Sequence, residues 1–140
     1  MITPTPTTRI DPKIARGVYG GTTAGKSLVR ILFPGTSYDL QLSPRGEVTA
    51  VEGKRIEGII ALDARRLDLV GTGGRFIEPV FGRPRRVQGM VVGVADGRLV
   101  VNCGVPLHLR LTDVRQQPER FEPGTMVGCD VMDGGTFTQS

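Results

Sequence analysis

Short stretches of alternating apolar and polar residues, separated by turn residues, run through most of the chain. The clearest is 107–112, where three leucines alternate with a histidine, an arginine and a threonine. Residues 38–43 alternate in the same way, and 28–33 is an apolar run that stops at Pro34-Gly35. A two-residue alternation is typical of a half-buried β-strand, and no long 3.6-residue period competes with it. The pattern predicts an all-β fold of about seven to nine short strands.

Turn residues divide these strands at short and regular intervals. Asp96-Gly97 stands between the apolar segments 90–95 and 98–103, and it supplies the positive φ angles that a tight hairpin turn needs. The polar segment 112–121 predicts a short helix or a helical turn before a last strand over 127–131. Turn signals about every 8 to 12 residues are typical of a sandwich or a small barrel. We therefore expect a small barrel or sandwich that is OB-like in general character.

Two segments of the chain, 55–80 and 86–111, resemble each other. The first six residues, Arg-Ile-Glu-Gly-Ile-Ile and Arg-Val-Gln-Gly-Met-Val, match in character position by position, 31 residues apart. Each segment continues through a glycine-containing break to a third apolar stretch. A hairpin-plus-strand unit cannot bury its apolar face alone, so a true duplication predicts two copies that share one core. The alternative is that turn chemistry alone makes short hairpins look alike.

The beginning of the chain differs from the rest. Residues 1–13 are rich in threonine and proline and predict an extended arm, whereas 14–140 has the size and composition of a single β domain. Such an arm becomes ordered by docking, and a barrel built from hairpins leaves strand edges that need covering. We therefore expect a homo-oligomer that uses the arm and the strand edges.

The composition also indicates the surroundings of the protein. No apolar run approaches the 18 residues of a membrane helix, and the first residues lack a secretory signal, so we expect a cytoplasmic protein without membrane contact. Cys103 and Cys129 lie in apolar segments without Cys-x-x-Cys spacing. This placement predicts buried, reduced thiols, with a disulfide or a metal site as the alternatives.

One motif matches a phosphate-binding loop. Gly20, Gly25, Lys26 and Ser27 occupy the defining positions of G-x-x-x-x-G-K-[ST]. Such a loop leaves a buried strand and enters a helix, but 13–19 is only weakly apolar and Pro34-Gly35 follows seven residues after Ser27. The surroundings therefore predict a chance match and no bound nucleotide or other cofactor. A true nucleotide site is the alternative.

No catalytic apparatus is evident in the chain. His108 is the single histidine, and alternation places it opposite the leucine face of its strand, where a surface or interface position is expected. Asp63 and Asp68 flank an expected hairpin, where solvated carboxylates are common. No spacing of His, Cys, Asp and Glu resembles a metal site. We therefore expect no catalytic residues, no metal and no enzymatic activity.

A cluster of basic residues is the best indication of a binding face. Six arginines and two phenylalanines fall within 22 residues: Arg65, Arg66, Arg75, Phe76, Phe81, Arg83, Arg85 and Arg86. Arginine beside exposed aromatic rings is typical of barrels that bind single-stranded nucleic acid. Alternatively, the phenylalanines belong to the core and 83–86 is a solvated connection.

The distribution of charge points to a different function. Residues 1–112 carry 16 Lys/Arg against 9 Asp/Glu, and 113–140 carry 2 against 5. Oppositely charged regions favour head-to-tail contacts between copies. The first functional expectation is therefore a non-enzymatic structural or assembly protein, and the alternative is a nucleic-acid-binding module that uses the arginine cluster.

Overall fold

The computed structural model describes residues 11–23 and 27–140, and strands dominate these residues. The strands are β1 (Ala15–Thr22), β2 (Val29–Leu32), β3 (Asp39–Pro44), β4 (Arg55–Ala64), β5 (Asp68–Leu69), β6 (Phe76–Glu78), β7 (Phe81–Gly82), β8 (Arg86–Ala95), β9 (Arg98–Asn102), β10 (Pro106–Leu111), β11 (Met126–Asp130) and β12 (Thr136–Gln139). The one helical element in the described part is the 3-10 turn η1 (Pro118–Arg120), which lies in the polar segment where a helical turn was expected. The prediction of an all-β fold is confirmed.

Five strands close into a barrel, which we call the first ring. Their order is β1-β2-β3-β12-β4, and β4 pairs back onto β1 from Ala15↔Gly58 to Val18↔Arg55. β3 and β12 are parallel, whereas the other neighbours are antiparallel. This is the strand order of a five-stranded Greek-key barrel of the OB type. The expected small barrel is therefore present.

A second circuit of strand pairs, which we call the second ring, uses the other half of β4. Its order is β4-β10-β9-β8-β11. The chain after β11 returns to β4 through the bridge Ala64↔Val131, and the backbone N–H of Arg65 donates to the carbonyl of Asp130 at 2.9 Å. Here β10 and β4 are the parallel pair. Each ring is thus a three-stranded meander, β1-β2-β3 in the first ring and β8-β9-β10 in the second. Two further strands close each meander, and one of them is parallel to its third strand: β12 to β3, and β4 to β10.

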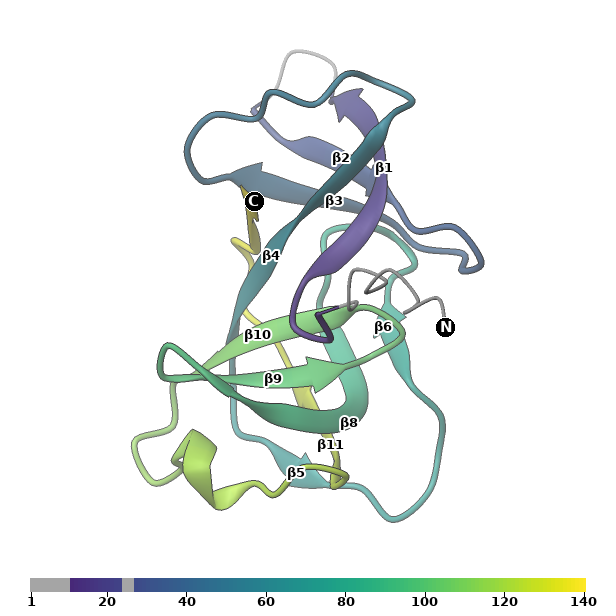
Figure 1. Cartoon of the computed structure of the whole chain (residues 1–140). Helices are drawn as coiled ribbons and strands as arrows, with labels where there is room; N and C mark the ends of the chain where they lie inside the picture. Colours follow the sequence, from purple (N-terminus) through teal and green to yellow (C-terminus); the bar gives the residue numbers. More distant parts are fainter. Residues whose placement is uncertain (1–10, 24–26) are drawn as a thin grey trace, which may run out of the picture.

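The two rings are joined because each is completed by a strand from the other half of the chain. β12, at the end of the chain, closes the first ring, and the last residues of β4 close the second ring. Figure 1 shows β4 running from the sheet of β1, β2 and β3 down to the sheet of β8, β9 and β10. The buried apolar residues of both rings form one continuous cluster. Neither ring can therefore close without the other half of the chain.

The sequence repeat corresponds to this structure only in part. β4 and β8 are both ten-residue strands, and the second copy forms the expected hairpin, with Asp96 at φ 49° and Gly97 at φ 75°. In the first copy β5 pairs with β11, so the expected hairpin is not formed. The reason is that β10 and residues 130–132 already occupy the two edges of this part of β4. The duplication itself stays a prediction.

The alternating segment 107–111 lies as predicted on its leucine side. Leu107 and Leu109 are fully buried, and Leu111 is half-buried against the same core. His108 was expected at a surface or interface position, but within this chain it is only 4% exposed, and its Nε2 lies 2.7 Å from the carbonyl oxygen of Lys13. β1 and β10 follow each other along one edge of β4, so the residues before β1 cover His108. The prediction of an exposed histidine was wrong for this reason.

Both cysteines are buried and free, as the sequence predicted. Burial is the main cause that raises the pKa of Cys129 to about 12, and burial also raises the pKa of Cys103. The reactive form of cysteine is the thiolate, and both thiols are protonated at neutral pH. The two residues therefore act as small core side chains.

The matched glycines of the two repeats, Gly58 and Gly89, share a physical role. A Cβ on Gly58 would lie 2.2 Å from the carbonyl oxygen of Thr138, and a Cβ on Gly89 would lie 2.2 Å from that of Asn102. Both distances are far inside van der Waals contact. Each glycine therefore marks a place where a long strand is approached too closely by its neighbour for any side chain.

Replacing Gly58 tests whether this close approach holds the first ring closed. We expect Gly58→Ala to lower the free energy of unfolding by about 1–3 kcal/mol, the usual cost of forcing atoms into a filled site. Gly93→Ala is the control, because a Cβ at that position meets nothing within 4 Å. The control should change stability by less than about 0.5 kcal/mol. Equal denaturation midpoints for the two variants in urea would contradict the explanation.

Candidate nucleic-acid interface

The outward side chains of β4 form a surface that both rings share. Along this strand Ile56, Gly58, Ile60, Leu62 and Ala64 are buried, and the residues between them are exposed or half-buried. Both cores thus lie on the same side of β4, so its other side faces solvent along its whole length. With a rise of about 3.3 Å per residue, the ten-residue strand is about 33 Å long.

A groove of about 440 Å³ lies over the second half of this surface. We call it the arginine groove, and its lining residues come from β12, β4, β10, β9 and two adjoining loops: Arg45, Ile59, Ala61, Asp63, Arg98, Arg110, Gly134, Thr136 and Thr138. Three arginines thus stand against one carboxylate. The fold brings together arginines that are up to 65 residues apart in the sequence.

The one acid of the groove is held by one of its arginines. Arg110 donates from Nε and Nη2 to the two carboxylate oxygens of Asp63 at 2.8 and 2.9 Å. These hydrogen bonds are the main cause that lowers the pKa of Asp63, and the nearby charge of Arg98 lowers it as well. Within the described residues, neither Arg45 nor Arg98 lies within 4.0 Å of a carboxylate. Two arginines of the groove are therefore available to an anionic ligand.

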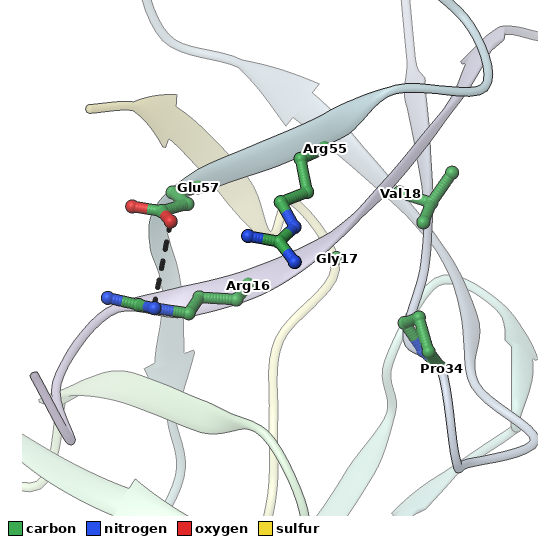
Figure 2. Close-up of a pocket in the computed structure, with 6 residues that line it drawn as sticks. All are labelled: Arg16, Gly17, Val18, Pro34, Arg55 and Glu57. Atoms are coloured by element: carbon green, nitrogen blue, oxygen red, sulfur yellow. Dashed lines mark ion pairs between the residues drawn. The ribbon is translucent and has the colours of Figure 1, made fainter. Parts of the chain in front are cut away.

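A second hollow, of about 300 Å³, lies over the first half of β4. Figure 2 shows its lining, with Arg55 and Glu57 from β4 facing Arg16 from β1, and Gly17, Val18 and Pro34 around them. We call it the Arg55 hollow. The Nε of Arg16 lies 3.7 Å from a carboxylate oxygen of Glu57, which is too long for a hydrogen bond. The pair therefore neutralises charge without fixing either side chain tightly.

The predicted arginine cluster divides into separate groups. Arg65 and Arg86 lie on either side of Asp130. The backbone N–H of Arg65 donates to the carbonyl of Asp130, and Asp130 on β11 pairs with Arg86 on β8. Arg86 forms an ion pair with Asp130 at 2.9 Å, and Arg83 forms one with Asp133 at 2.8 Å. Arg85 is exposed in the same region. This group borders the chain segment that leads into the arginine groove.

The other members of the predicted cluster lie elsewhere. Arg66 pairs with Asp68 at 3.7 Å beside β5, and Arg75 and Phe76 lie at β6, which pairs with β8. Phe81 is 60% exposed on β7, with the guanidinium carbon of Arg30 at 6.0 Å from the ring centre. β7 pairs with β3, which β12 separates from β4. The fold therefore separates Phe81 from the clustered arginines, whereas Phe76, on β6, stays beside Arg75.

Sequence reasoning missed the three arginines of the groove because they are isolated along the chain. Arg98 follows the Asp96-Gly97 turn and Arg110 alternates with the buried leucines, so each reads as an ordinary outward residue of a strand. Only the pairing of β4 with β10 and of β10 with β9 brings them together. The sequence did indicate that these arginines point outward from their strands, but it did not indicate which strands lie next to them.

The phosphate-loop motif lies between two antiparallel strands. Gly20 and Gly21 belong to β1, and β2 begins two residues after Ser27 and pairs back onto β1. A phosphate-binding loop of this type requires a helix to begin where β2 begins here. Gly25 and Lys26 lie outside the described residues, as do residues 1–10 of the predicted arm. The interpretation as a chance match stays a prediction with this physical reason behind it.

Comparison with models of known protein families finds no match, and comparison with curated proteins finds no relative. The described helical turn is too short to cross a membrane, and no other helix within these residues could do so. Over the same residues, no three His, Cys, Asp or Glu side chains come together in an arrangement suited to a metal ion. The features of the described residues that suggest a binding function are the two arginine-lined hollows along β4.

The pairing of Asp63 with Arg110 can be tested by titration. Because its pKa is lowered in the folded protein, Asp63 stabilises the fold above the pKa of an unfolded aspartate, and this contribution is lost as the pH falls through the lowered pKa. The side chain of Arg110 is 59% exposed and that of Asp63 is 43% exposed, so their ion pair contributes less than about 1 kcal/mol to the stability of the fold. We expect Arg110→Ala to raise the pKa of Asp63, measured by NMR of its carboxyl carbon.

Arg115→Ala is the matched control for this titration, because Arg115 pairs with Asp113 and not with Asp63. The control should leave the titration of Asp63 unchanged. An Asp63 signal that titrates identically in Arg110→Ala and in the unmodified protein would show that the ion pair does not form in solution.

Proposed function

We propose that the protein is a non-enzymatic binder of single-stranded nucleic acid, held along the outward surface of β4. The observation that supports this proposal is the arginine groove. There Arg45, Arg98 and Arg110 line a hollow over β4, the strand that the two rings share. Arginine pairs with phosphate oxygens through two parallel hydrogen bonds. OB-type barrels commonly bind oligonucleotides on their surface.

The composition of the groove supports contacts with more than the phosphates. Ile59 and Ala61 provide an apolar floor, and Thr136 and Thr138 provide hydroxyl groups beside it. Bases or sugars can rest on an apolar floor while the flanking arginines hold the phosphates. Exposed aromatic rings are absent from the lining residues, so arginine planes and aliphatic side chains supply the contacts to bases.

The shape favours a single strand over a duplex. Proteins read duplex DNA by placing a helix or a two-stranded ribbon into the major groove. The one helical element in the described residues is three residues long, and the arginines line a hollow instead of a ridge. A flexible single strand can enter such a hollow, with a site size of about 4 to 16 nucleotides for barrels of this type.

The proposal is tested by removing two groove arginines. We expect Arg45→Ala/Arg98→Ala, which removes the two groove arginines without a carboxylate partner among the described residues, to weaken binding of an oligothymidine of about 12 nucleotides. The slope of log affinity against log salt should fall by about 1.4, because each lost phosphate contact removes about 0.7 for single strands. Fluorescence anisotropy over a series of salt concentrations measures both quantities.

Two further variants complete this experiment. Arg115→Ala/Arg120→Ala removes the same number of charges outside the arginine groove and should leave the slope unchanged. Arg83→Ala/Arg85→Ala/Arg86→Ala tests the sequence-predicted group beside the groove. A slope that flattens only in this triple variant would place the interface at residues 83–86. No binding by the unmodified protein would refute nucleic-acid binding.

Homo-oligomeric assembly is our second proposal, and one exposed leucine beside a strand edge favours it. Leu69 on the two-residue edge strand β5 is 72% exposed and lines a hollow of about 640 Å³ with Leu67 and Phe121. The pairing of both rings leaves β5 as one of the short edges among the described strands. An exposed leucine beside a strand edge is suited to contact with another copy.

Mass measurement tests the assembly proposal independently of nucleic acid. We expect light scattering to give more than one chain per particle, and we expect Leu69→Glu to lower that mass, because a charge opposes burial of this surface. Deleting residues 1–10 tests the predicted arm while keeping Lys13 beside His108. A monomer at every concentration in the unmodified protein would contradict assembly.

A further inference from the structure

We infer that the Arg55 hollow is a second phosphate site, and that one bound strand runs along β4 from the arginine groove to this hollow. The inference rests on the proposed function, because it concerns the path of the same nucleic acid. It adds a separate anchor on the first ring, whereas the arginine groove spans the junction of the two rings.

The position of the hollow on β4 supports a continuous path. Arg55 and Glu57 line the hollow, and Ile59, Ala61 and Asp63 line the groove, all on the outward side of the same strand. Arg55 and Asp63 are eight residues apart, which is about 26 Å along a strand. The two sites therefore follow each other on one surface instead of lying on opposite faces of the molecule.

The charge of the hollow fits a phosphodiester. Arg16 and Arg55 stand against Glu57, so the hollow carries one excess positive charge, and a phosphodiester carries one negative charge. Among the described residues, Arg55 has no carboxylate within 4.0 Å. Figure 2 shows its guanidinium group beside Gly17, and Arg55 is exposed. Arg55 is therefore free to bind a phosphate.

Between Glu57 of the hollow and Asp63 of the groove, the outward side of β4 carries no charge. Ile59 and Ala61 are the outward residues between Glu57 and Asp63, and Thr138 lies opposite Ile59 on β12. A strand that crosses this surface meets apolar and hydroxyl groups, and its phosphates meet arginines at the two ends. The structure thus predicts two groups of phosphate contacts separated by a stretch without ionic contact.

The spacing also sets the length of strand that uses both sites. A stacked single strand rises about 3.4 Å per nucleotide, so about eight nucleotides cover the 26 Å between Arg55 and Asp63. A strand of about four nucleotides fills the arginine groove but does not reach the hollow. Dependence on Arg55 is therefore expected for long strands and not for short ones.

The test compares oligothymidines of about 4 and about 12 nucleotides on the full chain. We expect Arg55→Ala to weaken binding of the longer strand and to reduce its salt slope by about 0.7, with no effect on the shorter strand. Arg55→Lys should retain the slope because the charge is kept. Glu57→Gln should tighten binding of the longer strand, and Arg120→Ala is the control for loss of one charge.

The outcomes separate this inference from the proposed function. If Arg45→Ala/Arg98→Ala weakens binding of the longer strand but Arg55→Ala does not, the function stands and the second phosphate site is refuted. If Arg55→Ala weakened binding of the short and the long strand equally, the proposed path along β4 would also be refuted, because a short strand does not span the two sites. If neither strand binds the unmodified protein, the proposed function fails and this inference fails with it.

Discussion

Strand β4 belongs to two rings of strands at once, since its edges are occupied by different neighbours along its length. β1 and β12 flank its first half, and β10 and residues 130–132 flank its second half. Every second residue must therefore be apolar or glycine, because one side of the strand faces both cores. Gly58 is required where β12 approaches most closely. These pairings also leave no edge of β4 for a hairpin with β5.

The same sharing concentrates polar groups on the outside of β4. Residues that face away from the cores lie at the junction of the rings, where β12, β10 and β9 bring their own outward side chains beside them. Arg110 pairs with Asp63 in this way and Arg98 lies nearby, and the ion pair between Arg110 and Asp63 moderates the positive charge without cancelling it. The groove is thus a consequence of ring closure, and its excess of arginine supports the proposal of a polyanionic ligand.

Local features of the chain were predictable because their causes are local. Asp96-Gly97 forms its hairpin because neighbouring residues supply the turn, and Leu107 and Leu109 are buried because alternation alone separates the two faces of a strand. The cysteines are buried because each follows the alternation of its segment, Leu99-x-Val101-x-Cys103 and Val127-x-Cys129-x-Val131. In each case the residue and its determinant lie within a few positions of each other.

Taken alone, the sequence determined many of the strands, several turns and the apolar side of the alternating strands, since these depend on alternation and on residues such as glycine at turns. It did not predict β12, which follows the segment expected to be the last strand. Tertiary structure alone decided which strands pair, and with that the shared β4, the missing first hairpin and the burial of His108 behind Lys13. It also decided that Arg45, Arg98 and Arg110 meet, while Phe81 lies apart from them. The physical reason is that alternation depends on neighbouring residues and shows which face of a strand is buried. The strand that packs or pairs with it comes from a distant part of the chain.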